Sequence, residues 1–218
     1  NQGFLPPATV MEIQKDLFER GAYAESDRTR IPLYAELLIE RRDGMIGDDE
    51  FERRRSAMEQ HDIRRDWLNY LARTGVTQQY FASVQGGGGN VNYSISAGYD
   101  NEQGSLVGNG RSRMSLGIQN NFKVNRKISV SGSVWYTSDT ERNDGIPFST
   151  IGNALIYESL KDESGQPSPV NTQRYRYAYH KQAEAAGLLD WMYRPLDEVN
   201  LTESTNRSRN LRLNSGIQ

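Results

Sequence analysis

The sequence contains no cysteine and only two histidines, His61 and His180. Without cysteine the chain cannot form a disulfide framework or a thiolate metal site, and two histidines give little material for a zinc site or a charge-relay triad. No apolar run approaches 18 residues and the mean hydropathy is -0.76, which excludes a transmembrane helix. A barrel strand is half polar by construction, so this criterion does not apply to it.

Excess charge of either sign is also missing, because 26 basic residues face 28 acidic ones. Such a balance creates no large field, so we expect no nucleic-acid partner. The basic run Arg53–Arg55 is surrounded by acidic residues and is typical of a solvated helix face. The glycines at 86–89 lack the following Lys-Ser or Lys-Thr of a phosphate-binding loop. We therefore expect no cofactor and no metal.

Four consecutive segments between Gln78 and Thr137 alternate apolar and polar residues, which predicts antiparallel strands with one apolar face. The clearest segment places these residues on one side: Val91, Tyr93, Ile95, Ala97 and Tyr99. The apolar sides of the other three segments are Tyr80, Ala82 and Val84; Met114, Leu116 and Ile118; and Ile128, Val130, Val134 and Tyr136. Phe81 breaks the pattern of the first segment.

The connections predict an asymmetric sheet. Residues 86–90 and 123–127 form short turns at one end, while residues 101–110 form a longer loop at the other end. An excursion from Ser138 leads to an alternating tail near Leu211, again on the long-loop side. Strands of about ten residues with such loops are typical of an outer-membrane β-barrel. Aromatic residues near strand ends are typical of it too, and here they are Tyr80, Tyr99, Phe122 and Tyr136. Alternation alone is equally typical of a soluble meander with one dry face.

The same region resembles the early barrel region of SusC/RagA-type TonB-linked outer-membrane transporters. The resemblance is carried by several short sequence motifs in a fixed order. They are Asp66-Trp67-Leu68, Arg73-Thr74-Gly75-Val76-Thr77-Gln78-Gln79-Tyr80, Ser83-Val84-Gln85-Gly86-Gly87, Asn92-Tyr93-Ser94-Ile95-Ser96-Ala97-Gly98-Tyr99-Asp100, Gln103-Gly104 and Ser131-Gly132-Ser133. It extends from Asp66 to about Thr140 and is loose on either side. Members of that family have a signal peptide, an N-terminal plug and a 22-stranded barrel. The first two are not found here, so we expect an internal barrel fragment whose export signal was removed or lies upstream.

The resemblance implies a mainly β fold with helical excursions, in which an antiparallel meander forms part of the barrel. Residues 1–76 are expected to be a charged helical extracellular loop, 77–138 the four-stranded barrel segment, 139–206 a long extracellular excursion and 207–218 the start of a further strand.

What it implies for function is a non-enzymatic importer in a Bacteroidetes-type outer membrane. Such a protein contacts outer-membrane lipid and takes up an oligosaccharide or peptide nutrient with a SusD-like surface lipoprotein. The TonB complex supplies energy through regions absent from this chain.

Helices are predicted in both excursions. Residues Thr9–Glu12 form a capping box for a helix from Val10 to Arg20 that ends before Gly21. Further helices are expected over 32–41 and 49–73, and in the second excursion over 149–160 and 183–191.

Residues 43–51 are similar to the second half of an EF-hand calcium loop, with Gly44 as the turn glycine and Glu50 as the bidentate ligand. The loop's first ligand positions would be Ile39 and Arg41, which cannot bind calcium. A plain turn before an acid-capped helix is therefore the favoured interpretation. Calcium held in another geometry by Asp43, Asp48 and Asp49 is the alternative.

Three tyrosines, Tyr175, Tyr177 and Tyr179, fall on one side of a segment that reads as extended. Aromatic faces with hydrogen-bonding tips suit sugar or peptide recognition, so these are the candidate substrate residues. Packing within a large loop is the alternative role. Two further function classes compete with the importer: a soluble β-meander that binds carbohydrate or mediates adhesion, and a glycosidase, for which no motif places a pair of acids.

Overall fold

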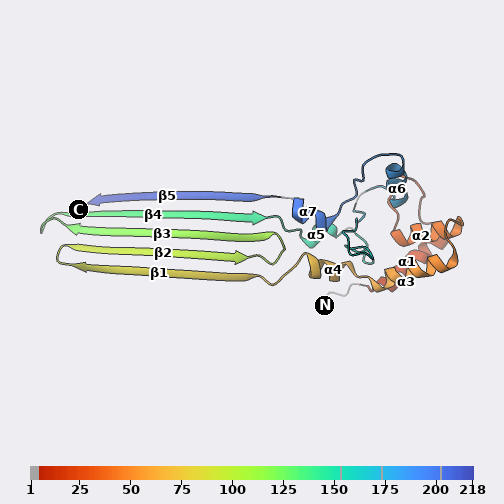
Figure 1. The fold of residues 1–218 in the computed structure, drawn as a ribbon, viewed down its shortest axis with the longest axis horizontal. Coiled ribbons are helices and arrows are strands. Elements are labelled where there is room, and N and C mark those ends of the chain that lie inside the picture. Colours follow the sequence, from red (N-terminus) through yellow and green to blue (C-terminus); the bar gives the residue numbers. More distant parts are fainter. Residues whose placement is uncertain (1–4, 153, 173, 202) are drawn as a thin grey trace. The chain divides into compact units, whose positions relative to one another are not determined.

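The computed structural model describes residues 5–152, 154–172, 174–201 and 203–218 and divides into two compact units (Figure 1). The first, called here the helical unit, contains residues 5–71 and the described part of 146–201. The second, the sheet unit, contains residues 72–145 and 203–218. The two stretches predicted to be separate excursions thus pack together in one unit.

The sheet unit is a single open antiparallel sheet in the order β1-β2-β3-β4-β5 (Figure 1). Its strands are β1 (Val76–Gly88), β2 (Val91–Gln103), β3 (Asn109–Lys123), β4 (Ser129–Asn143) and β5 (Thr205–Ile217). The predicted meander and the strand in the C-terminal tail are confirmed. Each strand contains 13 to 15 residues, more than the ten expected, because the pairing continues past the apolar residues into polar ones.

The predicted difference in loop length is confirmed only for the β4–β5 connection, residues 144–204. The β2–β3 loop is only residues 104–108, no longer than the β3–β4 loop at 124–128. Arg73 closes the β2–β3 loop, since its guanidinium donates to the Gly104 carbonyl at 2.9 Å and to the Asn109 carbonyl at 2.7 Å. The β1–β2 turn is residues 89–90, with Gly89 at φ +53°, a conformation that favours glycine.

The strand register aligns the apolar side chains into rows across the sheet, and we call this side the apolar face. One row consists of Val84, Ile95, Ile118, Val134 and Leu213, and the next of Ala82, Ala97, Leu116, Tyr136 and Leu211. The first row is 37 to 66% exposed. A row nearer the short turns is less apolar, because Asn120, Gly132 and Ser215 stand beside Tyr93.

Aromatic residues border the apolar face at both ends. Tyr80 and Tyr99 pair directly at one border, and Phe122 pairs with Val91 at the other. The borders are four rows apart, roughly 26 Å along the strands at 3.3 Å per residue. Tyr136 was expected at a strand end but lies in the middle of β4, opposite Leu116. Phe81 points to the opposite face, which explains why it breaks the alternation.

The buried hydrophobic residues of the described chain all lie in the helical unit, and none lies in β1–β5. Two clusters account for most of them. One groups Met11, Tyr34, Leu37, Leu38, Phe51 and Tyr157, and the other groups Ile63, Leu71, Ile146, Ile151, Leu160 and Val170. Each cluster joins residues from both stretches of the unit. The helical unit therefore has its own core, while the sheet has no buried apolar side.

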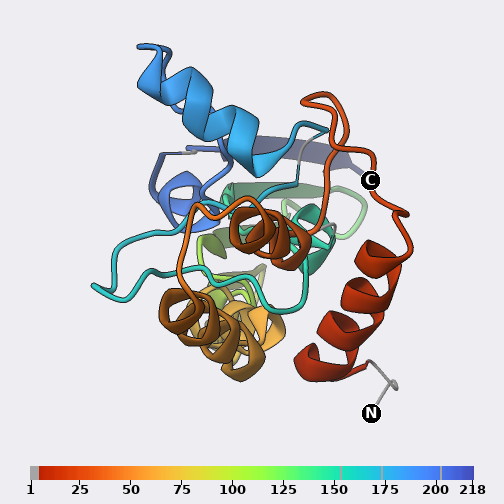
Figure 2. The ribbon, with the colours of Figure 1, turned by 90° about the vertical axis from the view of Figure 1, so that its right-hand side faces the viewer.

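The helices before the sheet are α1 (Pro7–Glu19), α2 (Leu33–Arg42), α3 (Asp48–Gln60) and α4 (Ile63–Tyr70). Figure 2 shows α1, in red, beside α2 and α3. The capping box at Thr9 was wrong, because α1 begins earlier, with Pro7 in its first turn. Gly21 ends the helix at φ +68°, as predicted. The single helix over 49–73 was also wrong, since α4 starts anew where the Asp62 carboxylate accepts from the Arg64 amide.

The remaining helices are α5 (Phe148–Ile151), α6 (Tyr177–Ala185) and α7 (Pro195–Leu201). The helix predicted over 149–160 is reduced to α5, and the one predicted over 183–191 is displaced toward the N-terminus as α6. Gly187 at φ +91° follows the end of α6. Among the described residues, none of the helices is both long enough and apolar enough to span a membrane.

Candidate functional site

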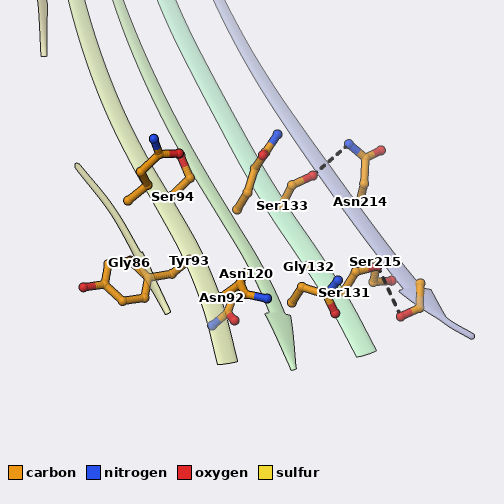
Figure 3. A pocket seen from close by; sticks show the side chains of 14 residues that line it. Gly86, Asn92, Tyr93, Ser94, Asn120, Ser131, Gly132, Ser133, Asn214 and Ser215 are labelled. Carbon is orange, nitrogen blue, oxygen red and sulfur yellow. Dashed lines mark hydrogen bonds between the residues drawn. The ribbon is translucent and has the colours of Figure 1, made fainter. Parts of the chain in front are cut away.

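The side of the sheet opposite the apolar face, called here the polar face, is the candidate functional surface. Near the short turns its side chains are uncharged amides and hydroxyls. One row contains Gln85, Ser94, Gln119, Ser133 and Asn214. These residues line a hollow of about 650 Å³ (Figure 3). The Asn214 amide donates to the Ser133 hydroxyl at 3.2 Å (Figure 3), so neighbouring strands are joined by side chains as well as by backbone.

Two aromatic rings stand on this otherwise polar surface. Trp135 covers Gly117, where an added Cβ would lie 2.4 Å from the indole Cζ3 atom. Phe81 lies beside Gly98 more loosely, with its Cδ2 atom 3.7 Å from where a Cβ would lie. In both pairs the ring covers backbone that the glycine leaves bare, which stabilises a sheet locally. The rings are nevertheless 41 and 75% exposed, so each also offers a flat apolar face to a ligand.

At the other end the polar face is charged, around a second hollow of about 560 Å³. The Arg111 guanidinium donates to the Asp139 carboxylate at 3.0 Å. Arg113 pairs in register with Asp100 on one side and with Asp139 on the other. Opposite charges facing each other across strands support the sheet.

The candidate substrate tyrosines do not share one side of an extended segment, because Tyr177 and Tyr179 belong to α6. Residues two apart on a helix point in different directions. The ring centroids of Tyr175 and Tyr179 are 5.4 Å apart. The two rings form an aromatic cluster with His180 and Trp191. Tyr177 instead lines a cavity of about 430 Å³ in the helical unit.

Glu158 is the unusual side chain of that cavity, with only 6% of its surface exposed. It accepts from the backbone amides of Leu155 and Asn171, both at 3.1 Å, and lies 3.9 Å from the Arg30 guanidinium. Burial raises the pKa of the Glu158 carboxyl to about 7, against the opposing effect of these donors. A carboxyl that titrates near neutrality inside a cavity is a candidate proton-responsive group.

The buried Glu158 should make the stability of the helical unit depend on pH. The folded state holds this proton more tightly than the unfolded chain, so its contribution to stability is complete below pH 4.5 and is lost as the pH rises through 7. The helical unit should lose on the order of 3 kcal/mol from this group over that range. Urea unfolding followed by helical circular dichroism at pH 5 and pH 8 measures the loss, and Glu158→Gln should remove it.

The exposed Glu163 is the matched control, because its side chain is 85% exposed and lies beside the same cavity. Glu163→Gln should keep the pH dependence of the unchanged chain. If Glu158→Gln and Glu163→Gln showed the same difference between pH 5 and pH 8, the titration would not belong to Glu158.

The calcium-loop residues serve other roles in the structure. Asp43 accepts from Arg42 at 2.8 Å, and Asp48 lies 2.8 Å from the Arg41 guanidinium. Gly44 is a turn glycine, as predicted, at φ +72°. Within the described ranges, no group of three or more His, Cys, Asp or Glu side chains could hold a metal ion.

Trp135 and the arginines of the polar face were not among the residues predicted to bind a ligand. The signal was present, because Trp135 stands at a polar phase of the β4 alternation, where an aromatic residue has no apolar neighbours to pack against. Comparison with protein-family models found no match to this chain, and comparison with curated proteins found none either.

Proposed function

We propose that the chain is part of a TonB-dependent outer-membrane importer of oligomeric nutrients that works with a SusD-like lipoprotein. The observation that carries this proposal is the apolar face. Ile95, Leu116 and Val130 are 49, 42 and 38% exposed, although they belong to continuous apolar rows. A sheet in water buries such a face against another layer, whereas a barrel wall presents it to lipid.

The dimensions of the sheet support a transmembrane wall. The apolar face is bordered by Tyr80 and Tyr99 at one end and by Phe122 at the other, as interfacial aromatic belts border a barrel. The roughly 26 Å between the borders becomes roughly 20 Å in depth when strands tilt by about 40°. This is comparable with the apolar band of an outer-membrane barrel, about 25 Å.

The open edges of the sheet support a larger barrel. Among the strands that the structure describes, β1 and β5 each pair on one side only. Strands of 13 residues with an unpaired edge are templates for further strands. In the proposed barrel of 22 strands, additional strands continue from both edges. The polar face then lines the bore, where Trp135 and the amide and hydroxyl rows meet the nutrient, a glycan or a peptide.

The helical unit fits the extracellular side of this arrangement. The chain passes between the two units before β1, after β4 and before β5, and these three strand ends lie opposite the short turns. Long insertions in outer-membrane barrels lie on the extracellular side. The helical unit is therefore the part that we propose contacts the SusD-like lipoprotein.

Membrane extraction tests the proposal. The full-length protein should stay in the outer-membrane fraction after a carbonate wash and should need detergent to become monodisperse. Release into the wash as a monodisperse protein without detergent would contradict the barrel and favour the soluble β-meander module.

A further inference from the structure

Charge is distributed unequally between the two faces of the sheet. All acidic side chains of β1–β5 lie on the polar face: Asp100, Glu102, Asp139 and Glu141. The apolar face carries charge only at its loop end, and there all the charged residues are arginines: Arg142, Arg207 and Arg209. In the row of the polar face that lies between Arg207 and Arg209, Arg113 stands between Asp100 and Asp139. A general need for solubility would not separate the signs in this way.

Two of these arginines lie directly at the border of the apolar surface. Arg209 stands in the row of Tyr80 and Tyr99, and Arg207 lies one row further from the apolar residues. Both side chains are exposed. Their Cα atoms are roughly 7 Å apart, two residues along one strand, so the two guanidinium groups can reach the same anion.

The immediate neighbours of the pair are hydrogen-bond donors and not acids. Ser138 stands opposite Arg209, and Thr140 stands opposite Arg207. Arg142, one row further, is held 3.2 Å from Asp144. Within the described parts of the chain, no carboxylate forms an ion pair with Arg207 or Arg209. The strand therefore presents two guanidinium groups and two hydroxyls on one face.

Along β5, the residues that follow the pair on the same face are apolar. Leu211 and Leu213 follow on the same side of β5 and are 61 and 66% exposed, and Tyr136 stands opposite Leu211. A ligand that fits this surface has an anionic head at the arginines and a hydrocarbon tail along the leucines. Guanidinium binds phosphate through two parallel hydrogen bonds, and arginine at an interface attracts anionic headgroups.

We propose that Arg207 and Arg209, with the hydroxyls of Ser138 and Thr140, bind the phosphate of an anionic membrane lipid whose acyl chains lie along Tyr136, Leu211 and Leu213. The site rests on the proposed function, because it needs the apolar face of the sheet to be in lipid. It is distinct from the nutrient path, which follows the polar face. Its role is to fix an anionic lipid against β5 at the extracellular border.

Lipid binding to the full-length protein in neutral detergent tests the site. Short-chain phosphatidylglycerol is titrated and retained lipid is counted by native mass spectrometry. Arg207→Gln/Arg209→Gln should weaken binding about thirtyfold, as expected for the loss of two interfacial charges. Arg207→Lys/Arg209→Lys keeps the charge without the planar fork and should recover part of the affinity.

Arg212 provides the matched control, because it lies on the same strand and points to the polar face. Arg212→Gln should bind phosphatidylglycerol like the unchanged protein. Soluble glycerol phosphate and uncharged diacylglycerol should each bind at least tenfold more weakly than phosphatidylglycerol, since each provides half of the ligand.

Three results would overturn the lipid site. These are unchanged binding by Arg207→Gln/Arg209→Gln, an equal loss in Arg212→Gln, and equally tight binding of glycerol phosphate. If any of them occurs in a protein that needs detergent, the proposed lipid site is wrong and the proposed barrel is unaffected. If the protein is monodisperse without detergent, the proposed function itself fails.

Discussion

Ile118→Arg should destabilise the protein in a bilayer by about 2–4 kcal/mol, the cost of a charge on the lipid face near the middle of an outer-membrane barrel. Ile118 lies in the most apolar row, between Ile95 and Val134. Urea titration of folding into liposomes measures the change. In an exposed surface in water, the same substitution would cost no more than about 0.5 kcal/mol.

The control is the adjacent Gln119→Arg, which places the same charge on the polar face beside Ser94 and Ser133. A side chain that faces a water-filled bore tolerates charge, so its effect should stay within about 0.5 kcal/mol. Equal effects at 118 and 119 would show that the two faces meet the same solvent.

Breaking the ion pair between Glu36 and Arg176 should destabilise the helical unit by about 3–5 kcal/mol, because the remaining charge would be buried alone. The Arg176 guanidinium donates twice to the Glu36 carboxylate, at 3.0 and 2.6 Å, and the two side chains are 11 and 4% exposed. The pair connects α2 to the start of α6. Urea unfolding of Glu36→Ala and Arg176→Ala, followed by helical circular dichroism, measures the cost.

The double variant Glu36→Ala/Arg176→Ala should lose less than the sum of the single variants, since neither charge is then left unpaired. Arg53→Ala is the control. Its partners Glu50 and Glu163 lie at the surface, and exposed pairs contribute about 0–1 kcal/mol. A loss in Arg176→Ala no larger than in Arg53→Ala would mean that water reaches the buried pair.

The strands and their faces follow from the sequence because a period of two leaves no choice of face once one side is apolar. The same alternation places Ile95 against Ile118 and Ile118 against Val134. Strand length was underestimated because pairing needs only backbone groups. Polar residues on both sides of β4, such as Ser138 and Asp139, continue the ladder without an apolar signal.

The helical unit was harder to predict because its contacts join distant parts of the chain. Glu36 and Arg176 are separated by 140 positions, and no local pattern points from one to the other. The tyrosines at 175, 177 and 179 alternate like a strand, but tertiary packing makes α6 from the segment and buries His180 at 4% exposure. The break between α3 and α4 did have a local signal, the capping residue Asp62.

Solvent access along β3 distinguishes a sheet that faces lipid from one that faces water. Spin labelling of the full-length protein in liposomes measures it. This chain contains no cysteine, so once any cysteine outside it is replaced, each single-cysteine variant reports one position. Spin labels at Met114, Leu116 and Ile118 should relax faster in the presence of oxygen, which dissolves in lipid. Labels at Arg113, Ser115 and Gln119 should relax faster in the presence of a water-soluble nickel chelate. Equal access of the nickel chelate to both sets of labels would show that the apolar face does not meet lipid.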